Sequence, residues 1–109
     1  MPISDLINLA LKINTLYDEI NAQKNRPNWT AMETTEGLVG DVGDLVKLMQ
    51  AKFNKRAYKG ELPLDEALKH EVCDVLWSVL VLADHLDFDL ESEFVTQMKI
   101  LQERLQKQV

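Results

Sequence analysis

The sequence predicts an all-α fold, a bundle of four to five helices that forms a single domain over residues 1–109. Three observations lead to this prediction. Apolar residues recur every three or four positions through long segments, which is the pattern of an amphipathic helix. No segment shows the two-residue alternation of a half-buried strand. The chain has only three prolines and four glycines, so few positions interrupt a helix.

The first helix is expected from about Ser4 to Gln23. Its apolar face consists of residues at three- and four-residue spacing: Leu6, Leu9, Ile13, Leu16 and Ile20. Ser4 or Asp5 is the expected N-cap, because a short polar side chain can accept hydrogen bonds from the free N–H groups of the first turn. Pro27 lies in the break that follows, since proline cannot continue a helix.

The second helix is expected from about Thr30 to Phe53, where Thr30 and Glu33 have the spacing of a capping box. It contains three glycines that lie along one side at a spacing of three: Gly37, Gly40 and Gly43. Each of them costs up to about 1 kcal/mol relative to alanine inside a helix. We therefore expect another helix or a ligand to approach the backbone closely along this stretch.

The third helix is expected from about Leu64 to His85, and its centre at residues 75–83 is apolar on nearly every side. Such a segment is typical of a helix that is buried in a bundle or that faces a second subunit. The last helix is expected from Leu90 to about Gln106, after a short turn. Its apolar stripe consists of Phe94, Met98 or Leu101, and Leu105.

The composition excludes several classes of function. The formal net charge is −6, whereas binding to duplex nucleic acid depends on Lys and Arg that neutralise phosphates. No apolar run is long enough to cross a bilayer, and the first residues do not form a secretory signal. The single Cys73 excludes an intrachain disulfide and favours a reducing compartment. We therefore expect a cytoplasmic protein that binds neither nucleic acid nor membrane.

Two pairs of carboxylates carry the candidate chemistry. Asp41 and Asp44 are three positions apart in the second helix, and Glu71 and Asp74 are three apart in the third. Residues three apart point within about 60° of each other, so each pair can present two carboxylates to one point. If the helices pack antiparallel, the pairs can face each other and form a hard oxygen site for Mg²⁺ or Mn²⁺. The alternative is a solvated acidic face.

Two motifs resemble those of the MazG-like all-α nucleoside triphosphate pyrophosphohydrolases, a group that includes dCTP pyrophosphatases. Residues 38–45 read Leu-Val-Gly-Asp-Val-Gly-Asp-Leu and resemble the first motif of this family. Residues 71–77 read Glu-Val-Cys-Asp-Val-Leu-Trp and match its Glu-x-x-Asp-Val-Leu motif. The similarity extends over residues 29–98. It implies a MazG-like helical architecture that is completed by assembly into a homodimer or homotetramer.

The resemblance also implies an activity, the Mg²⁺-dependent cleavage of an NTP or dNTP to the monophosphate and pyrophosphate. By position, it assigns the metal ligands and catalytic carboxylates: Asp41, Asp44, Glu71 and Asp74. Lys52 aligns with a lysine that can reach a phosphate, and Trp29 lies where relatives place residues near the base. Ser78 occupies the position of an aromatic residue that approaches the base in relatives.

The chain departs from the family pattern at several positions. The family's glutamates are aspartates at positions 41 and 44, and Gly40 stands where some relatives have a further glutamate. Gln97 and Leu101 replace a lysine and an asparagine of the dCTP pyrophosphatase-like members. These departures leave open the base, the sugar and the number of metal ions. They also leave open two alternatives to an active enzyme: a weak or inactive nucleotide-binding helical oligomer, and a purely structural helical protein.

Three further residues close to these motifs are expected to have no direct chemical role. Cys73 lies among apolar residues of the third helix and is expected to be a buried, inert thiol. His70 and His85 have no partner at the spacing of a zinc site or of a nucleophile and its base. We expect both histidines at the surface or beside the site.

Overall fold

The structure, a computed structural model that describes residues 1–109, contains four α-helices and no strand. They are α1 (Ile3–Gln23), α2 (Ala31–Lys52), α3 (Leu64–His85) and α4 (Leu90–Gln106). The predicted all-α fold is confirmed. α3 and α4 begin and end at the predicted residues, and the ends of α1 and α2 lie within one residue of the prediction. No helix of the chain has both the length and the apolar character needed to span a membrane.

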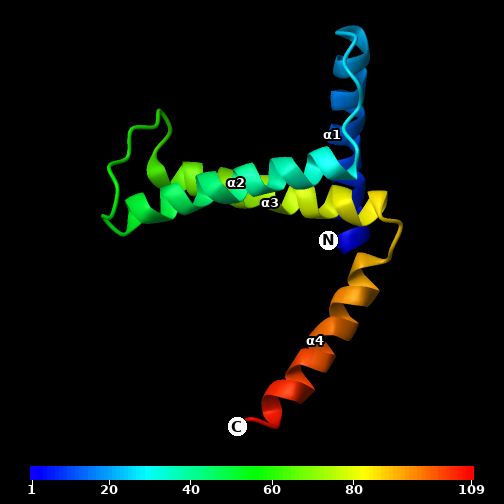
Figure 1. Ribbon diagram of the computed structural model, residues 1–109, viewed down its shortest axis with the longest axis vertical. Helices are drawn as coiled ribbons and strands as arrows, with labels where there is room; N and C mark the ends of the chain where they lie inside the picture. Colours follow the sequence, from blue (N-terminus) through cyan, green and yellow to red (C-terminus); the bar gives the residue numbers. More distant parts are fainter.

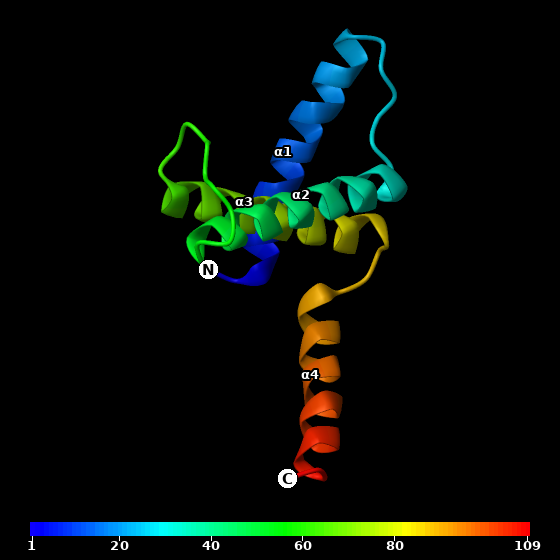
Figure 2. The ribbon, with the colours of Figure 1, turned by 60° about the vertical axis from the view of Figure 1, so that its left-hand side comes forward.

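The helices form an open arrangement (Figure 1). α2 and α3 run antiparallel, side by side, and α1 crosses α3 (Figures 1 and 2). α4 leaves the end of α3 and points away from the other three helices. The radius of gyration is 17.2 Å, whereas a compact chain of this length has a radius of about 13 Å. The helices therefore do not enclose one common core.

The buried core is small. Only six of the 109 residues are buried, and a cluster of Ala10, Leu80 and Val81 joins α1 to α3. The prediction for the centre of α3 is confirmed in part, because Leu80 and Val81 are buried while Leu76 and Val79 remain exposed. Many apolar side chains that the sequence predicts to be packed are therefore exposed to solvent in the single chain.

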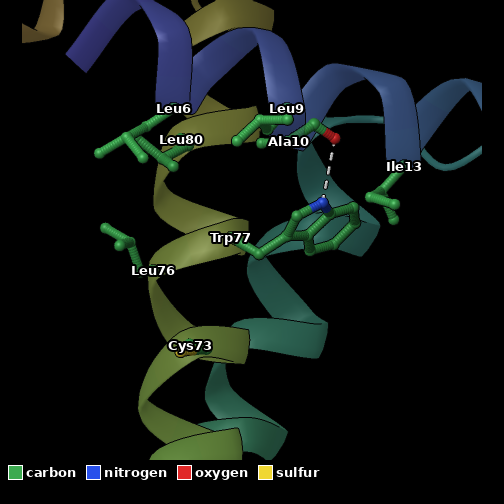
Figure 3. Close-up of a pocket in the computed structure, with 8 residues that line it drawn as sticks. All are labelled: Leu6, Leu9, Ala10, Ile13, Cys73, Leu76, Trp77 and Leu80. Atoms are coloured by element: carbon green, nitrogen blue, oxygen red, sulfur yellow. Dashed lines mark hydrogen bonds between the residues drawn. The ribbon is translucent and has the colours of Figure 1, made fainter. Parts of the chain in front are cut away.

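Trp77 attaches α3 to α1. Its indole Nε1 donates a hydrogen bond of 3.1 Å to the backbone carbonyl of Ala10 (Figure 3). The ring of Tyr17 meets the indole edge-to-face, with 5.9 Å between the ring centroids, which is a favourable geometry for an aromatic pair. The indole thus combines apolar contact with a directional bond, and this fixes where α1 crosses α3.

The first three helices end in the same way. Asn25, Asn54 and Asp87 follow them with positive φ values of 53°, 60° and 56°. In each case the N–H of this residue and the N–H of the next one bond back to carbonyls of the last helical turn, which is the Schellman arrangement. Asparagine and aspartate tolerate this left-handed conformation better than other non-glycine residues. The chain therefore turns sharply at the end of each helix.

The beginnings of the helices differ from one another. The prediction of Ser4 or Asp5 as the first N-cap is wrong: Pro2 precedes the helix, and its carbonyl accepts from the N–H of Asp5, so both polar residues lie inside the first turn. Thr30 is the N-cap of α2, as predicted, but its side chain makes no capping hydrogen bond to the backbone. Its hydroxyl instead donates to the carboxylate of Glu33, which lowers the pKa of that carboxyl. α4 begins at Asp89, whose side chain accepts from the backbone N–H of Ser92.

We predict that Asn54→Gly raises the free energy of unfolding by up to about 1 kcal/mol, because glycine adopts the left-handed conformation without a steric cost. Asn28→Gly is the matched control, since Asn28 does not have a positive φ, and this change should be neutral or slightly destabilising. Urea unfolding followed by circular dichroism measures both. Equal effects of the two substitutions would contradict the role assigned to position 54.

Candidate functional site

The α2–α3 hairpin brings acidic side chains from both helices together. Asp41 and Asp44 on α2 and Glu71 on α3 each have a carboxylate oxygen within 4.8 Å of the others. Their positions follow from the antiparallel packing, because two residues of one helix face one residue of the other. Asp41 and Glu71 are half-buried and Asp44 is exposed, so the cluster lies at the surface of the hairpin and is open to a ligand.

Asp74, the fourth predicted carboxylate, lies beside this cluster rather than inside it. It is close enough for its charge to act on both Asp41 and Glu71. Its Oδ2 is 3.7 Å from Nε2 of His70, one turn earlier on α3. His70 is thus placed beside the site, as expected, next to the carboxylate of Asp74.

The electrostatics of the cluster disfavour four ionised carboxylates. Burial raises the pKa of the Asp41 carboxyl above its ordinary value, and the charges of Asp74 and Asp44 raise it further. Burial is also the first cause of a raised pKa at Glu71, followed by repulsion from Asp74, Asp41 and Asp44, while His70 opposes the shift. A cation placed among these groups would favour their charged forms.

The carboxylate of Glu71 provides a second, independent indication of a ligand. Its Oε2 is buried and has no hydrogen-bond partner in the chain. A buried charged oxygen without a partner is costly. Coordination by a divalent ion would satisfy this oxygen, and the oxygen-only donor set is the kind that Mg²⁺ prefers. The residues present therefore fit a hard divalent cation, the class to which Mg²⁺ belongs.

Trp29 lies against α2 one turn before the cluster. A Cβ placed on Gly37 would come within 2.9 Å of Cζ3 of the Trp29 indole, so the ring packs on the helix backbone where only glycine leaves room. Gly37 precedes Asp41 by four residues, which puts both on the same side of α2. A close approach thus occurs at Gly37, but it is made by the Trp29 side chain from the segment before α2 and not by another helix or a ligand. It does not occur within the chain at Gly40 or Gly43, where a Cβ would meet nothing.

The other predicted site residues are placed differently. Lys52 lies at the far end of α2, where its Nζ pairs with Oδ1 of Asp65 at 3.1 Å. Ser78 is buried, one turn after Asp74 on α3. Gln97 and Leu101 lie on α4, which points away from the hairpin. The single chain therefore brings together the carboxylates and the indole near them, but not the residues of α4.

One feature of this region is absent from the sequence-based prediction. The Oγ1 of Thr34 is buried without a hydrogen-bond partner, and Thr34 precedes Asp41 by seven residues, on the same face of α2. This seven-residue spacing is the signal that could have identified it. The prediction of a buried Cys73 is wrong, because the thiol is exposed. It lies among the residues that line a shallow apolar pocket between α1 and α3 (Figure 3).

Comparison of the chain with known protein families, with curated proteins and with solved structures finds no match. The functional argument therefore rests on the residues of the α2–α3 hairpin. These are a carboxylate cluster, a buried oxygen without a partner, and a half-exposed indole on the same side of α2.

We predict that Asp41→Asn stabilises the metal-free protein at neutral pH. The pKa of Asp41 in the folded chain is above its ordinary value of 3.8, so the folded state holds this proton more tightly than the unfolded state. The resulting stability is present below pH 3.8 and is lost as the pH rises through the folded pKa. The substitution should therefore raise the Tm in EDTA at pH 7 and have little effect near pH 4.

Asp18→Asn on α1 is the matched control, because Asp18 lies outside the cluster and the same loss of one charge should produce no such pH-dependent gain. Thermal unfolding between pH 4 and pH 8 compares the two variants with the wild type. A stabilisation of equal size at every pH, or in both variants, would contradict the assigned repulsion.

Proposed function

We propose that the chain is a Mg²⁺-dependent nucleoside triphosphate pyrophosphohydrolase, which cleaves an NTP or dNTP to its monophosphate and pyrophosphate. The observation that carries the proposal is the convergence of Asp41, Asp44 and Glu71 within 4.8 Å across two helices. The buried, unpartnered Oε2 of Glu71 supports it, since like charges this close disfavour ionisation unless a cation pairs with them. The two motifs that resemble the MazG-like family supply the reaction class.

The carboxylates of the hairpin would hold the metal, and one of them would accept a proton. Asp41, Asp44 and Glu71 are the proposed ligands, with Asp74 completing the set from beside the cluster. A bound Mg²⁺ supplies positive charge to the phosphate oxygens and makes a water molecule more acidic. One carboxylate accepts the proton of the attacking water, whose oxygen bonds to the α-phosphorus. The α–β phosphoanhydride bond breaks, and pyrophosphate leaves with the electron pair.

The remaining predicted residues would bind the substrate. The half-exposed Trp29 indole offers a flat surface to a nucleobase about one helical turn from Asp41. Lys52 lies about 16 Å along the helix from Asp41, so it would contact only the phosphates most distant from the base, after its Nζ leaves Oδ1 of Asp65. Ser78 is buried, so a contact between its hydroxyl and the base requires a small opening of the hairpin. These roles are those that the resemblance implies.

Assembly is part of the same proposal. The resemblance implies a homodimer or homotetramer with the site completed by a second subunit. The open shape of the chain, with its small core and large exposed apolar residues, supports such an assembly. The position of α4 is consistent with it, because the residues of α4 could reach the site of another copy but not their own.

A nucleotide-binding oligomer without activity is the second candidate. One observation favours it: both acidic residues on α2 are aspartates, each shorter than glutamate by one methylene, and Asp44 is exposed. A shorter side chain places its oxygens closer to the helix, which can leave a bound ion too far from the scissile phosphate. This candidate binds nucleotide and metal but releases no pyrophosphate.

We predict metal-dependent release of pyrophosphate from a panel of canonical and modified NTPs and dNTPs, with arms that contain Mg²⁺, Mn²⁺ or EDTA. Glu71→Gln should lower kcat by about 10²–10⁴-fold, because it removes both a negative ligand and a proton acceptor. Glu66→Gln is the matched control on the same helix, where Glu66 is exposed and pairs only with Lys69, and it should retain activity.

Two results would contradict the proposed activity. If a folded wild-type protein binds nucleotide but releases no pyrophosphate from any member of the panel, the inactive alternative replaces the enzyme. If neither Mg²⁺ nor nucleotide binds, as measured by isothermal titration calorimetry, both nucleotide-dependent functions fail and a structural role remains.

We predict that Trp29→Ala raises the KM for the preferred nucleotide by about 5- to 100-fold with a smaller change in kcat, the range expected for the loss of one base–aromatic stacking contact. Met32→Ala is the matched control, because Met32 is an exposed apolar residue in the first turn of α2. Steady-state kinetics of both variants measure the difference. An unchanged KM in Trp29→Ala would show that the indole does not contact the base.

A further inference from the structure

Two of the buried residues of the chain are polar, Thr34 on α2 and Ser78 on α3, which are 1% and 3% exposed. Each lies seven residues, or two helical turns, from a carboxylate of the cluster: Thr34 precedes Asp41, and Ser78 follows Glu71. Because α2 and α3 are antiparallel (Figure 1), both steps lead toward the same end of the hairpin. The two helices therefore carry hydroxyls at one level and carboxylates about 10 Å away.

The hydroxyl of Thr34 has no partner in the chain, although its Oγ1 is buried. The neighbouring Thr35 shows the usual alternative, because its Oγ1 donates to the backbone carbonyl of Ala31 at 2.7 Å, four residues earlier in the helix. Thr34 makes no such bond. A buried polar group without a hydrogen bond is rare and costly in folded proteins. The Thr34 hydroxyl is therefore free to bond with a group from outside the chain.

Gly37 and Trp29 lie between this hydroxyl and the carboxylates. Gly37 is three residues after Thr34 and four before Asp41, so all three positions share one side of α2. The missing side chain leaves a gap on the helix, and the Trp29 indole lies over it. Trp29 belongs to residues 26–30, which form no regular structure, and is 49% exposed. Its ring can therefore move aside without breaking a helical hydrogen bond, which opens the gap next to Thr34.

The spacing of these groups along α2 matches the length of a nucleotide. The levels of Thr34 and Asp41 are about 10 Å apart. In a nucleotide, the sugar and the base separate the α-phosphorus from the far edge of the base by a similar length. That edge carries an exocyclic amino or carbonyl group, and a threonine hydroxyl can accept from the first or donate to the second. The flat face of the base is suited to stacking on the indole.

We propose that Thr34 is a specificity-determining residue, whose hydroxyl forms a hydrogen bond with the exocyclic group of a nucleobase that enters the gap over Gly37. The base stacks on Trp29 and presents its position 6, in a purine, or its position 4, in a pyrimidine. This proposal rests on the proposed function, because it places the α-phosphate at the carboxylates. The indole contributes affinity for any base, whereas the Thr34 hydroxyl selects bases with a polar group at this edge.

Isothermal titration calorimetry with Mg²⁺ measures the selection apart from turnover. The ligands are nucleoside triphosphates in which a methylene group replaces the α–β bridging oxygen, so that no bond is cleaved. Once the preferred base is known, it is compared with an analogue that has hydrogen in place of the exocyclic group. The wild type should bind the analogue about 5- to 150-fold more weakly, because the Thr34 hydroxyl stays unpaired in that complex.

Thr34→Val removes the hydroxyl and keeps the shape of the side chain. In this variant the ratio of the two dissociation constants should fall to about one, and the Tm of the ligand-free protein should rise, because an unpartnered buried hydroxyl is gone. Thr34→Ser should restore the ratio. Thr35→Val is the matched control: Thr35 is exposed and its hydroxyl already bonds to Ala31, so this variant should keep the wild-type ratio without a gain in Tm.

Two results would overturn this role of Thr34 and leave the proposed hydrolysis intact. The first is a wild type that binds the preferred nucleotide and its analogue equally. The second is a Thr34→Val variant that gains stability but keeps the wild-type ratio, which would show that the hydroxyl contacts no base. A wild type that binds no nucleotide at all is a different outcome, because the proposed function then fails together with the role of Thr34.

Discussion

The antiparallel packing of α2 against α3 is the contact on which the candidate site depends. It places residues that are about thirty positions apart in the sequence across a shared helix boundary, so that Asp41, Asp44 and Glu71 converge. The same packing half-buries Glu71 and leaves one of its oxygens without a partner. A shift of one residue in the relative position of these helices would separate the carboxylates. The chemistry therefore depends on the register of one helical hairpin.

Two tryptophans add contacts to the α2–α3 hairpin. Trp77 connects α3 to α1 through one hydrogen bond and an aromatic contact, and Trp29 packs on Gly37, one turn before Asp41. The two tryptophans thus contact different neighbours. Trp77 contributes to the small core, and Trp29 lies on α2 near the carboxylates.

Local signals made much of the fold predictable from the sequence. Pro63 and Leu64 mark the start of α3, and the apolar periodicity of α4 marks its extent. The three-residue spacing of the acids also predicted that each pair shares a helix face. The remaining features depend on how helices meet. No local pattern in the sequence indicates three of them: the pairing of Lys52 with Asp65, the packing of Trp29 on Gly37 and the exposure of Cys73. The apolar periodicity of α4 identifies the face that would pack against another surface, but it does not identify that surface.

The small core has a consequence for how this protein behaves in a cell. With six buried residues, the core of the single chain contributes little of the free energy that opposes unfolding. In the proposed assembly, contacts between chains would add to this free energy, so stability would follow mass action and the midpoint of unfolding would rise with the concentration of the protein. Dilution, or a low rate of synthesis, favours the unfolded chain. The folded fraction would then increase with the amount of protein made. The number of folded molecules would therefore rise more steeply than the number of chains synthesised.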